Sequence, residues 1–302
     1  MDWQRDLPTW PHNAWSRRVV CAPHCWHVQE HGKGPTLLFL HGAGASSHSW
    51  NAMMTELSQD HHVVAIDLPG HGFTTLGASN RSGLTQMSED VAALCKQEGW
   101  RPQKIIAHSA GAAIALQLCE HHLTPDIQPQ SVLAINPAFT DFDGLAGVLF
   151  PLIAKSLAVN PLTPWLFTLG PDAKSRAKRL IASTGSTIPA EQLSLYARLL
   201  KDRKHVQGAL FMMAQWSLRG FRTTLPQSQT PTEIVVGLND QAVPPDRTAE
   251  VQQSLPNSTL TELPNLGHLA HEEAPELFVS LVRSAIEDSR QSDPRPYRSN
   301  LL

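Results

Sequence analysis

An apolar strand pattern runs straight into a helix pattern in KIIAHSAGAAIALQLCEHH, residues 104–122. Ser109 stands at the junction, where the chain must turn so sharply that the residues two before and two after it have to be small. Ala107 and Gly111 meet that requirement, and the alanines that follow allow the helix to lie close to a sheet. An N-cap serine of an ordinary helix would also stand here. The junction therefore predicts a strand–turn–helix unit with a candidate nucleophile at the turn.

The same alternation of strand and helix extends along much of the chain. Short apolar runs predict further buried strands at Thr36–Leu40, His62–Leu68, Ser131–Asn136, Thr232–Gly237 and Ser258–Leu263. Helix-spaced apolar residues lie between them, at Ser49–Gln59, Met87–Leu94 and beyond, and Asp246–Ser254, and a closing helix is predicted at Pro275–Asp288. Strands that alternate with helices indicate an α/β fold with a mostly parallel central sheet and helices on both faces.

The alternation of strand and helix patterns stops in the middle of the sequence. Residues 140–225 are punctuated by proline and have helical patterns only, whereas residues 1–139 and 226–302 carry the strands. We therefore expect a core built from two stretches of chain, interrupted by a helical insertion and followed by a flexible polar tail. An insertion above the carboxyl ends of the strands would form a cap over a site.

Two further residues give Ser109 the partners that a nucleophilic serine needs, a base and an acid that orients the base. Asp240 follows one predicted strand in GLNDQAVPP, and His268 follows the next in PNLGHLAHEE. Carboxyl ends of parallel strands share one edge of the sheet, so the sequence predicts a Ser109–His268–Asp240 triad. Competing groups remain: Asn136 and Asp141 for the acid position, and His271, His108 and His41 for the base.

An oxyanion hole is predicted beside the serine. The segment LHGAGASS, Leu40–Ser47, leaves a strand through small residues whose backbone N–H groups are free to meet a negative oxygen. We assign the amides of Ala43 and Ala110 to it. Asp67 in DLPGHG is interpreted as a structural turn residue. Neither glycine pattern of a phosphate-binding loop is complete. A serine hydrolase mechanism requires no metal and no organic cofactor, so none is expected.

Bulk composition narrows the function classes. The chain has 302 residues and a net charge of −3, which offers nucleic acid no general attraction. The first residues lack the basic and apolar regions of a secretion signal, and the four cysteines have no disulfide or zinc spacing, which favours the cytoplasm. The apolar stretch 145–170 is interrupted by proline and lysine, so we expect no transmembrane segment, although it suits peripheral membrane contact.

The segments LHGAG, DLPGHG, AHSAG, GLNDQAVP and LGHLAHEE together resemble the α/β-hydrolase family, in order and over nearly the whole chain. AHSAG departs from G-x-S-x-G by an alanine in place of the first glycine. Within that family, HSAGAAIAL, DLPGHGFT, STGS, MMAQWSL and GHLAHEE resemble the magnesium chelatase accessory proteins of bacteriochlorophyll biosynthesis. That closer resemblance implies photosynthetic bacteria, a tetrapyrrole partner and an association with magnesium insertion into protoporphyrin IX by magnesium chelatase.

A tetrapyrrole would suit the apolar side chains of the insertion. Candidates for contact with a planar ligand are Trp165, Phe167, Phe211, Met212, Met213 and Trp216, and most of them would serve equally as the core of the insertion. The basic residues Lys174, Arg176, Lys178 and Arg179 would attract propionate groups or form a solvated helix face. Two functions follow: a serine hydrolase for an ester or related carbonyl substrate, or a porphyrin-binding accessory protein with an idle triad.

Overall fold

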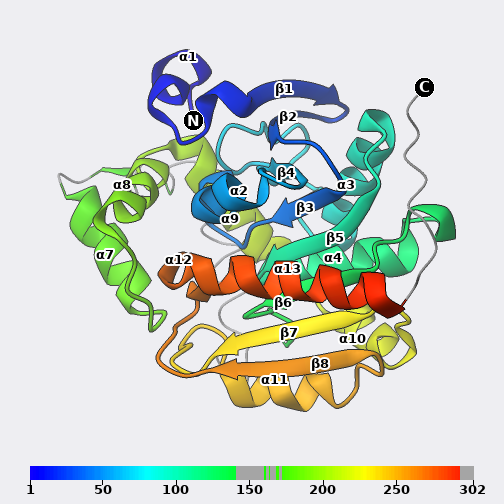
Figure 1. The fold of residues 1–302 in the computed structure, drawn as a ribbon. Helices are drawn as coiled ribbons and strands as arrows, with labels where there is room; N and C mark the ends of the chain where they lie inside the picture. Colours follow the sequence, from blue (N-terminus) through cyan, green and yellow to red (C-terminus); the bar gives the residue numbers. More distant parts are fainter. Residues whose placement is uncertain (141–159, 161–162, 164–167, 170–171, 293–302) are drawn as a thin grey trace.

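A computed structural model describes residues 1–140, 160, 163, 168–169 and 172–292 of the chain. An eight-stranded sheet forms its centre (Figure 1). The strands, in chain order, are β1 Ser16–Cys21, β2 His24–His31, β3 Thr36–Leu40, β4 His62–Ile66, β5 Pro102–His108, β6 Ser131–Ile135, β7 Thr232–Gly237 and β8 Ser258–Leu263.

The sheet order is β1-β2-β4-β3-β5-β6-β7-β8. From β4 to β8 all neighbours run parallel, and β1 and β2 add an antiparallel hairpin at one edge. The mostly parallel sheet predicted from the sequence is therefore confirmed, with each predicted strand within two residues of its observed ends. The hairpin β1–β2 was not predicted. The parallel strands bring their carboxyl ends to one edge, which is where a site belongs in such a sheet.

Alternate residues of the central strands pack into two separate cores, one on each face of the sheet. In β3, Leu38 and Leu40 pack on one face, whereas Leu37 and Phe39 pack on the other. The first face is covered by α3 Leu84–Glu98, α4 Ala110–His121 and α11 Pro245–Gln252, and the second by α2 Asn51–Leu57 and α13 Pro275–Ser292. Figure 1 shows α13 crossing the near face of the sheet. Burial on both faces explains the continuous apolar runs of these strands.

Between β6 and β7, the described residues form the α-helices α7 Ala173–Ala182, α8 Ala190–Leu199, α9 Arg203–Gln215 and α10 Arg219–Thr224. Through Phe221, helix α10 packs into the core that α3 and α4 also cover. Helices α7 and α8 form a smaller apolar cluster with the N-terminal residues Leu7 and Trp10. Figure 1 shows α7 and α8 side by side at one end of the sheet. The predicted boundaries of the insertion, 140 and 225, stay a prediction.

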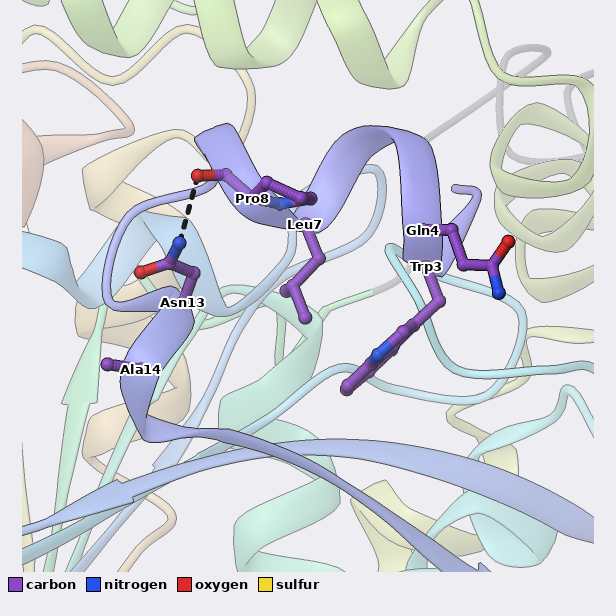
Figure 2. Close-up of a pocket in the computed structure, with 6 residues that line it drawn as sticks. All are labelled: Trp3, Gln4, Leu7, Pro8, Asn13 and Ala14. Carbon is purple, nitrogen blue, oxygen red and sulfur yellow. Dashed lines mark hydrogen bonds between the residues drawn. The ribbon is translucent and has the colours of Figure 1, made fainter.

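A surface pocket lies at the N-terminal segment and is shown in Figure 2. Its lining comes from α1 Trp3–Asp6 and the turns that follow, namely Trp3, Gln4, Leu7, Pro8, Asn13 and Ala14. The Asn13 side-chain amide closes one side by donating a 2.9 Å hydrogen bond to the Pro8 carbonyl. None of the residues predicted for the site lines this pocket.

Candidate active site

Ser109 sits between β5 and α4 in a backbone conformation that is unusual for any residue other than glycine, with φ +52° and ψ −119°. Neighbouring backbone holds it there: the Ser109 amide donates to the Ile135 carbonyl at 3.0 Å, and its carbonyl accepts from the Ala138 amide at 3.1 Å. A strained conformation that the surroundings over-determine is typical of a functional position.

Gly111 makes the close approach of α4 to the sheet possible. A Cβ atom at this position would lie 2.4 Å from the Leu40 carbonyl oxygen and 2.6 Å from that of His41. Both oxygens belong to backbone and have little freedom to move. A side chain here would push the start of α4, and with it Ser109, away from β3.

Ser109, His268 and Asp240 come together at the carboxyl edge of the sheet. His268 Nε2 lies 3.1 Å from Ser109 Oγ, and His268 Nδ1 lies 2.7 Å from Asp240 Oδ2. A carboxylate only accepts hydrogen bonds, so Nδ1 carries the proton and Nε2 faces the serine hydroxyl as an acceptor. All three residues are at least nine-tenths buried. The geometry is that of a hydroxyl activated by an oriented imidazole.

The Asp240 carboxylate is held by three other donors. Its Oδ1 accepts from the backbone amides of Ala242 at 2.7 Å and Val243 at 2.8 Å, and its Oδ2 accepts from the Asn136 side-chain amide at 2.7 Å. Asn136, considered above as an alternative at the acid position, is therefore a donor to Asp240. Asp141, the other alternative, lies outside the described residues.

The competing histidines are engaged in buried contacts of their own. His108 donates from Nε2 to the His268 carbonyl oxygen at 2.8 Å, His271 Nε2 lies 3.0 Å from Ser49 Oγ, and His41 Nε2 accepts from the Leu68 amide at 2.9 Å. Burial lowers the pKa of each, for His271 to about 3, so all three stay neutral at physiological pH. His108 thus fixes the backbone of His268 rather than competing with its ring.

The two amides predicted for the oxyanion hole belong to segments next to Ser109. The loop that carries Ala43 lies against the serine, because a Cβ at Gly42 would stand 2.9 Å from Ser109 Cβ. Ala110 is the first residue of α4, where backbone N–H groups have no partner within the helix. In the part of the chain that the structure describes, neither amide donates a hydrogen bond. Both are thus available to an oxygen beside Ser109.

Asp67 has the structural surroundings predicted for it. Its fully buried carboxylate faces His27 Nδ1 at 2.7 Å and accepts from the backbone amides of Ser47 at 2.7 Å and Phe73 at 2.8 Å. Burial alone would raise its pKa, but the charge and hydrogen bond of His27 and the amides outweigh burial and lower it far below its ordinary range. These contacts hold the loop after β3, strand β2 and the turn after β4 together.

A second buried polar cluster adjoins the site. Glu272 Oε1, on α12 Ala270–Glu273, accepts from the Tyr196 hydroxyl at 2.6 Å and from Ser49 Oγ. Desolvation raises the pKa of this completely buried carboxyl to about 7. Tyr196 belongs to α8, so the cluster joins the helices between β6 and β7 to the core.

The side chains considered for a planar ligand have different surroundings. Met212 is 1% exposed and packs in the core between the sheet and α3 and α4. A place in the apolar core is the alternative role that the sequence also allowed. Met213, Phe211 and Trp216 are half-buried. Trp165 and Phe167 lie outside the described residues. Of the basic residues on α7, Lys174, Lys178 and Arg179 are exposed, and Arg176 is half-buried.

Across the described residues, no group of three or more His, Cys, Asp or Glu side chains is arranged to hold a metal ion. Among the described helices, none is both long and apolar enough to cross a bilayer.

The fold and the site together define a class of protein, and comparison with known proteins agrees with it: the chain belongs to the α/β hydrolase family, whose model, described as the alpha/beta hydrolase fold, matches residues 35–275. The chain is 39% identical over 286 residues to the magnesium-chelatase 30 kDa subunit of Rhodobacter capsulatus, covering 94% of this chain and 99% of that protein. It is 24% identical over 268 residues to the pimeloyl-[acyl-carrier protein] methyl ester esterase of Nitrosospira multiformis, covering 86% and 97%. An α/β hydrolase fold protein from Burkholderia ambifaria superposes with a TM-score of 0.72 at 22% identity, covering 89% and 97%, and so shares the fold.

Sequence reasoning missed some residues that hold the site. The sequence did not predict that His108 donates to the His268 carbonyl or that Asn136 donates to Asp240. The turn Ser183–Ser186 was noted only as part of the resemblance to the magnesium chelatase accessory proteins. A polar residue directly before the nucleophile and another at the end of β6 were the available signals.

Proposed function

We propose that this protein is a serine hydrolase that acts on an ester or related carbonyl substrate. One observation carries the proposal: the hydrogen-bonded series from Ser109 Oγ through the His268 ring to Asp240 Oδ2, with distances of 3.1 and 2.7 Å. Esterases among the relatives support the same reaction class.

In the first half-reaction, Ser109 Oγ attacks the carbonyl carbon of the substrate while His268 Nε2 takes the hydroxyl proton. Asp240 stabilises the imidazolium that forms, and the Ala43 and Ala110 amides bind the negative oxygen of the tetrahedral intermediate. Collapse of the intermediate breaks the bond to the leaving group, which receives the proton from His268. The acyl group is then an ester on Ser109.

In the second half-reaction, water is the nucleophile. His268 Nε2 takes a proton from the water as its oxygen attacks the acyl carbon, and the same two amides bind the negative oxygen. Collapse returns the proton to Ser109 Oγ and releases the carboxylic acid. In both half-reactions, every proton is transferred through His268, a residue of this chain.

For the substrate class, we propose an ester carried on a tetrapyrrole or isoprenoid intermediate of bacteriochlorophyll biosynthesis, beneath a cap formed by residues 140–225. The relative named magnesium-chelatase 30 kDa subunit supports that setting. The half-buried Met213 and Trp216 give the insertion apolar surface for a large planar molecule.

A fluorophosphonate probe tests the reaction class, since it reacts with an activated serine. We expect the folded wild type to be labelled, and Ser109→Ala to abolish the label. Ser183→Ala is the matched control, because Ser183 is exposed and its hydroxyl donates to the Leu180 carbonyl, so it should label like the wild type. A folded wild type that does not react contradicts the proposal.

A second candidate function is a porphyrin-binding accessory protein that assists magnesium chelatase, favoured by the name of the 39% identical relative. Titration of protoporphyrin IX, followed by its absorbance, tests it: Ser109→Ala should bind like the wild type, and Trp216→Ala should bind more weakly. Replacing Lys174, Arg176, Lys178 and Arg179 by Gln tests whether α7 attracts the propionates. Tight binding with no probe labelling would favour this function over the hydrolase.

A further inference from the structure

The turn that follows α7 contacts both loops that supply the base and the acid. The Thr184 carbonyl oxygen accepts from the His268 amide at 3.3 Å and from the Gln241 amide at 3.2 Å. His268 belongs to the loop after β8, and Gln241 stands next to Asp240 in the loop after β7. A single carbonyl from the segment between β6 and β7 therefore bridges the two loops.

A second contact from the same turn holds the loop after β8. Ser186 Oγ accepts a 2.8 Å hydrogen bond from the amide of Leu269, the residue that follows His268. Ser186 is 3% exposed, so water cannot readily replace this bond. The base is thus held through its own amide and through that of its neighbour.

Glycines allow the turn to lie this close. Gly185 has φ +79°, and a Cβ there would stand 1.8 Å from the Asn239 carbonyl oxygen. On the opposite side, a Cβ at Gly267 would stand 2.4 Å from the Gly185 backbone. Backbone therefore packs directly on backbone where the turn meets the two loops.

We propose that Thr184 and Ser186 are positioning residues for the proposed hydrolase. They hold the loops of Asp240 and His268 in the correct position relative to each other. The proposal rests on the proposed function. The two loops leave different strands, and a small relative displacement would lengthen the contact between His268 Nδ1 and Asp240 Oδ2 or between Nε2 and Ser109 Oγ. Through this turn, the segment between β6 and β7 contributes to catalysis by setting the geometry of the triad.

The test is the Ser186→Ala variant, which removes the acceptor for the Leu269 amide. With a fluorophosphonate probe, we expect the maximal rate of acylation of Ser109 to fall roughly tenfold, because misplacement of a catalytic group by about 1 Å costs up to about 100-fold and a smaller displacement costs less. The probe concentration for half-maximal rate should stay unchanged, since no residue that contacts the probe is altered.

Ser183→Ala on the same turn is the control. It removes a hydroxyl that donates to the Leu180 carbonyl and contacts neither loop of the site. This variant should keep the wild-type rate. If Ser186→Ala lowers the melting temperature but leaves the maximal acylation rate of the folded protein unchanged, Ser186 is a structural residue and the proposal is wrong.

Hydrogen exchange separates failure of this proposal from failure of the proposed function. In Ser186→Ala, the backbone amides of His268 and Leu269 should exchange faster, whereas those of β5 should not change. If the wild type does not react with the probe, the hydrolase proposal fails while faster exchange still shows that the turn holds the loop. Unchanged exchange at both amides overturns the positioning role.

Discussion

The side-chain amide of Asn136 and the carboxylate of Asp240 face each other at 2.7 Å across the ends of β6 and β7. The oxygen that accepts from Asn136, Oδ2, is the one that faces His268 Nδ1. Asn136 has φ +44°, a conformation that asparagine tolerates better than most residues. The acid is therefore oriented from the neighbouring strand as well as from its own loop.

Loss of the Asn136 amide should slow the reaction at Ser109. A hydrogen bond to a charged group contributes about 1.5–3 kcal/mol, so we expect Asn136→Gly to lower the acylation rate by roughly tenfold or more. Asn136→Ala should show a similar rate loss and, in addition, a lower free energy of unfolding, because alanine is strained at positive φ. Probe kinetics and urea unfolding of both variants measure the two effects separately. Wild-type rates in both variants would show that Asp240 needs no help from Asn136.

The backbone strain at Ser109 predicts a stability gain when the nucleophile is removed in one particular way. Glycine adopts positive φ without steric cost, whereas alanine does not. We therefore expect Ser109→Gly to have a free energy of unfolding about 1 kcal/mol or more above that of Ser109→Ala, with both variants inactive. Denaturant titration of the two inactive proteins makes the comparison. Equal stability would mean that the turn holds no strain to release.

Close packing at Gly111 predicts a large effect from a single methyl group. Because a Cβ there would meet two backbone carbonyls within 2.6 Å, Gly111→Ala should lower the free energy of unfolding by more than 3 kcal/mol and remove probe labelling. The control is Gly220→Ala in α10, where a Cβ would meet nothing within 4 Å. That variant should be neutral or stabilised by up to about 1 kcal/mol, since alanine favours helix. Thermal unfolding of the pair tests the contrast.

Much of this architecture could be predicted because its signals are local. Thr36–Leu40 and Ser258–Leu263 are strands with the predicted bounds, since apolar runs between turn residues leave few alternatives. The β1–β2 hairpin escaped prediction because β2 is rich in histidine. His27 is fully buried there only because Asp67, 40 residues later, faces its Nδ1 at 2.7 Å. Burial that depends on a distant partner leaves no periodic pattern in the strand itself.

The residues of the site also differ in whether the sequence could predict them. Ser109, Asp240 and His268 could be placed because strand ends of a parallel sheet meet at one edge. The turn of Thr184 and Ser186 could not, because its main contact is a backbone carbonyl, which any residue type supplies. Side-chain chemistry is readable from sequence, whereas the placement of backbone from an insertion depends on tertiary packing.

The buried carboxyl of Glu272 predicts a pH dependence of stability. It lies among His271, Tyr196 and Ser49, and Tyr196 in turn packs edge-on against His48. Burial raises its pKa from an ordinary value of 4.5 to about 7, whereas His48 and His271 stay neutral with pKa values near 3. Between pH 4.5 and 7 the folded protein therefore holds a proton on Glu272 that the unfolded chain has lost.

The free energy of unfolding therefore falls as the pH rises through this range, because the folded state binds more protons than the unfolded state. Glu272→Gln keeps the shape of the side chain and removes the titration. Relative to the wild type, its free energy of unfolding should increase by about 3 kcal/mol between pH 4.5 and pH 7.5 and change little above that. The buried histidines titrate alike in both proteins, so their effect cancels in the difference. Urea unfolding at several pH values measures it, with Glu276→Gln on the exposed first turn of α13 as the control that should follow the wild type. A constant difference between Glu272→Gln and wild type across this range would mean that the pKa of Glu272 is the same in the folded and the unfolded protein.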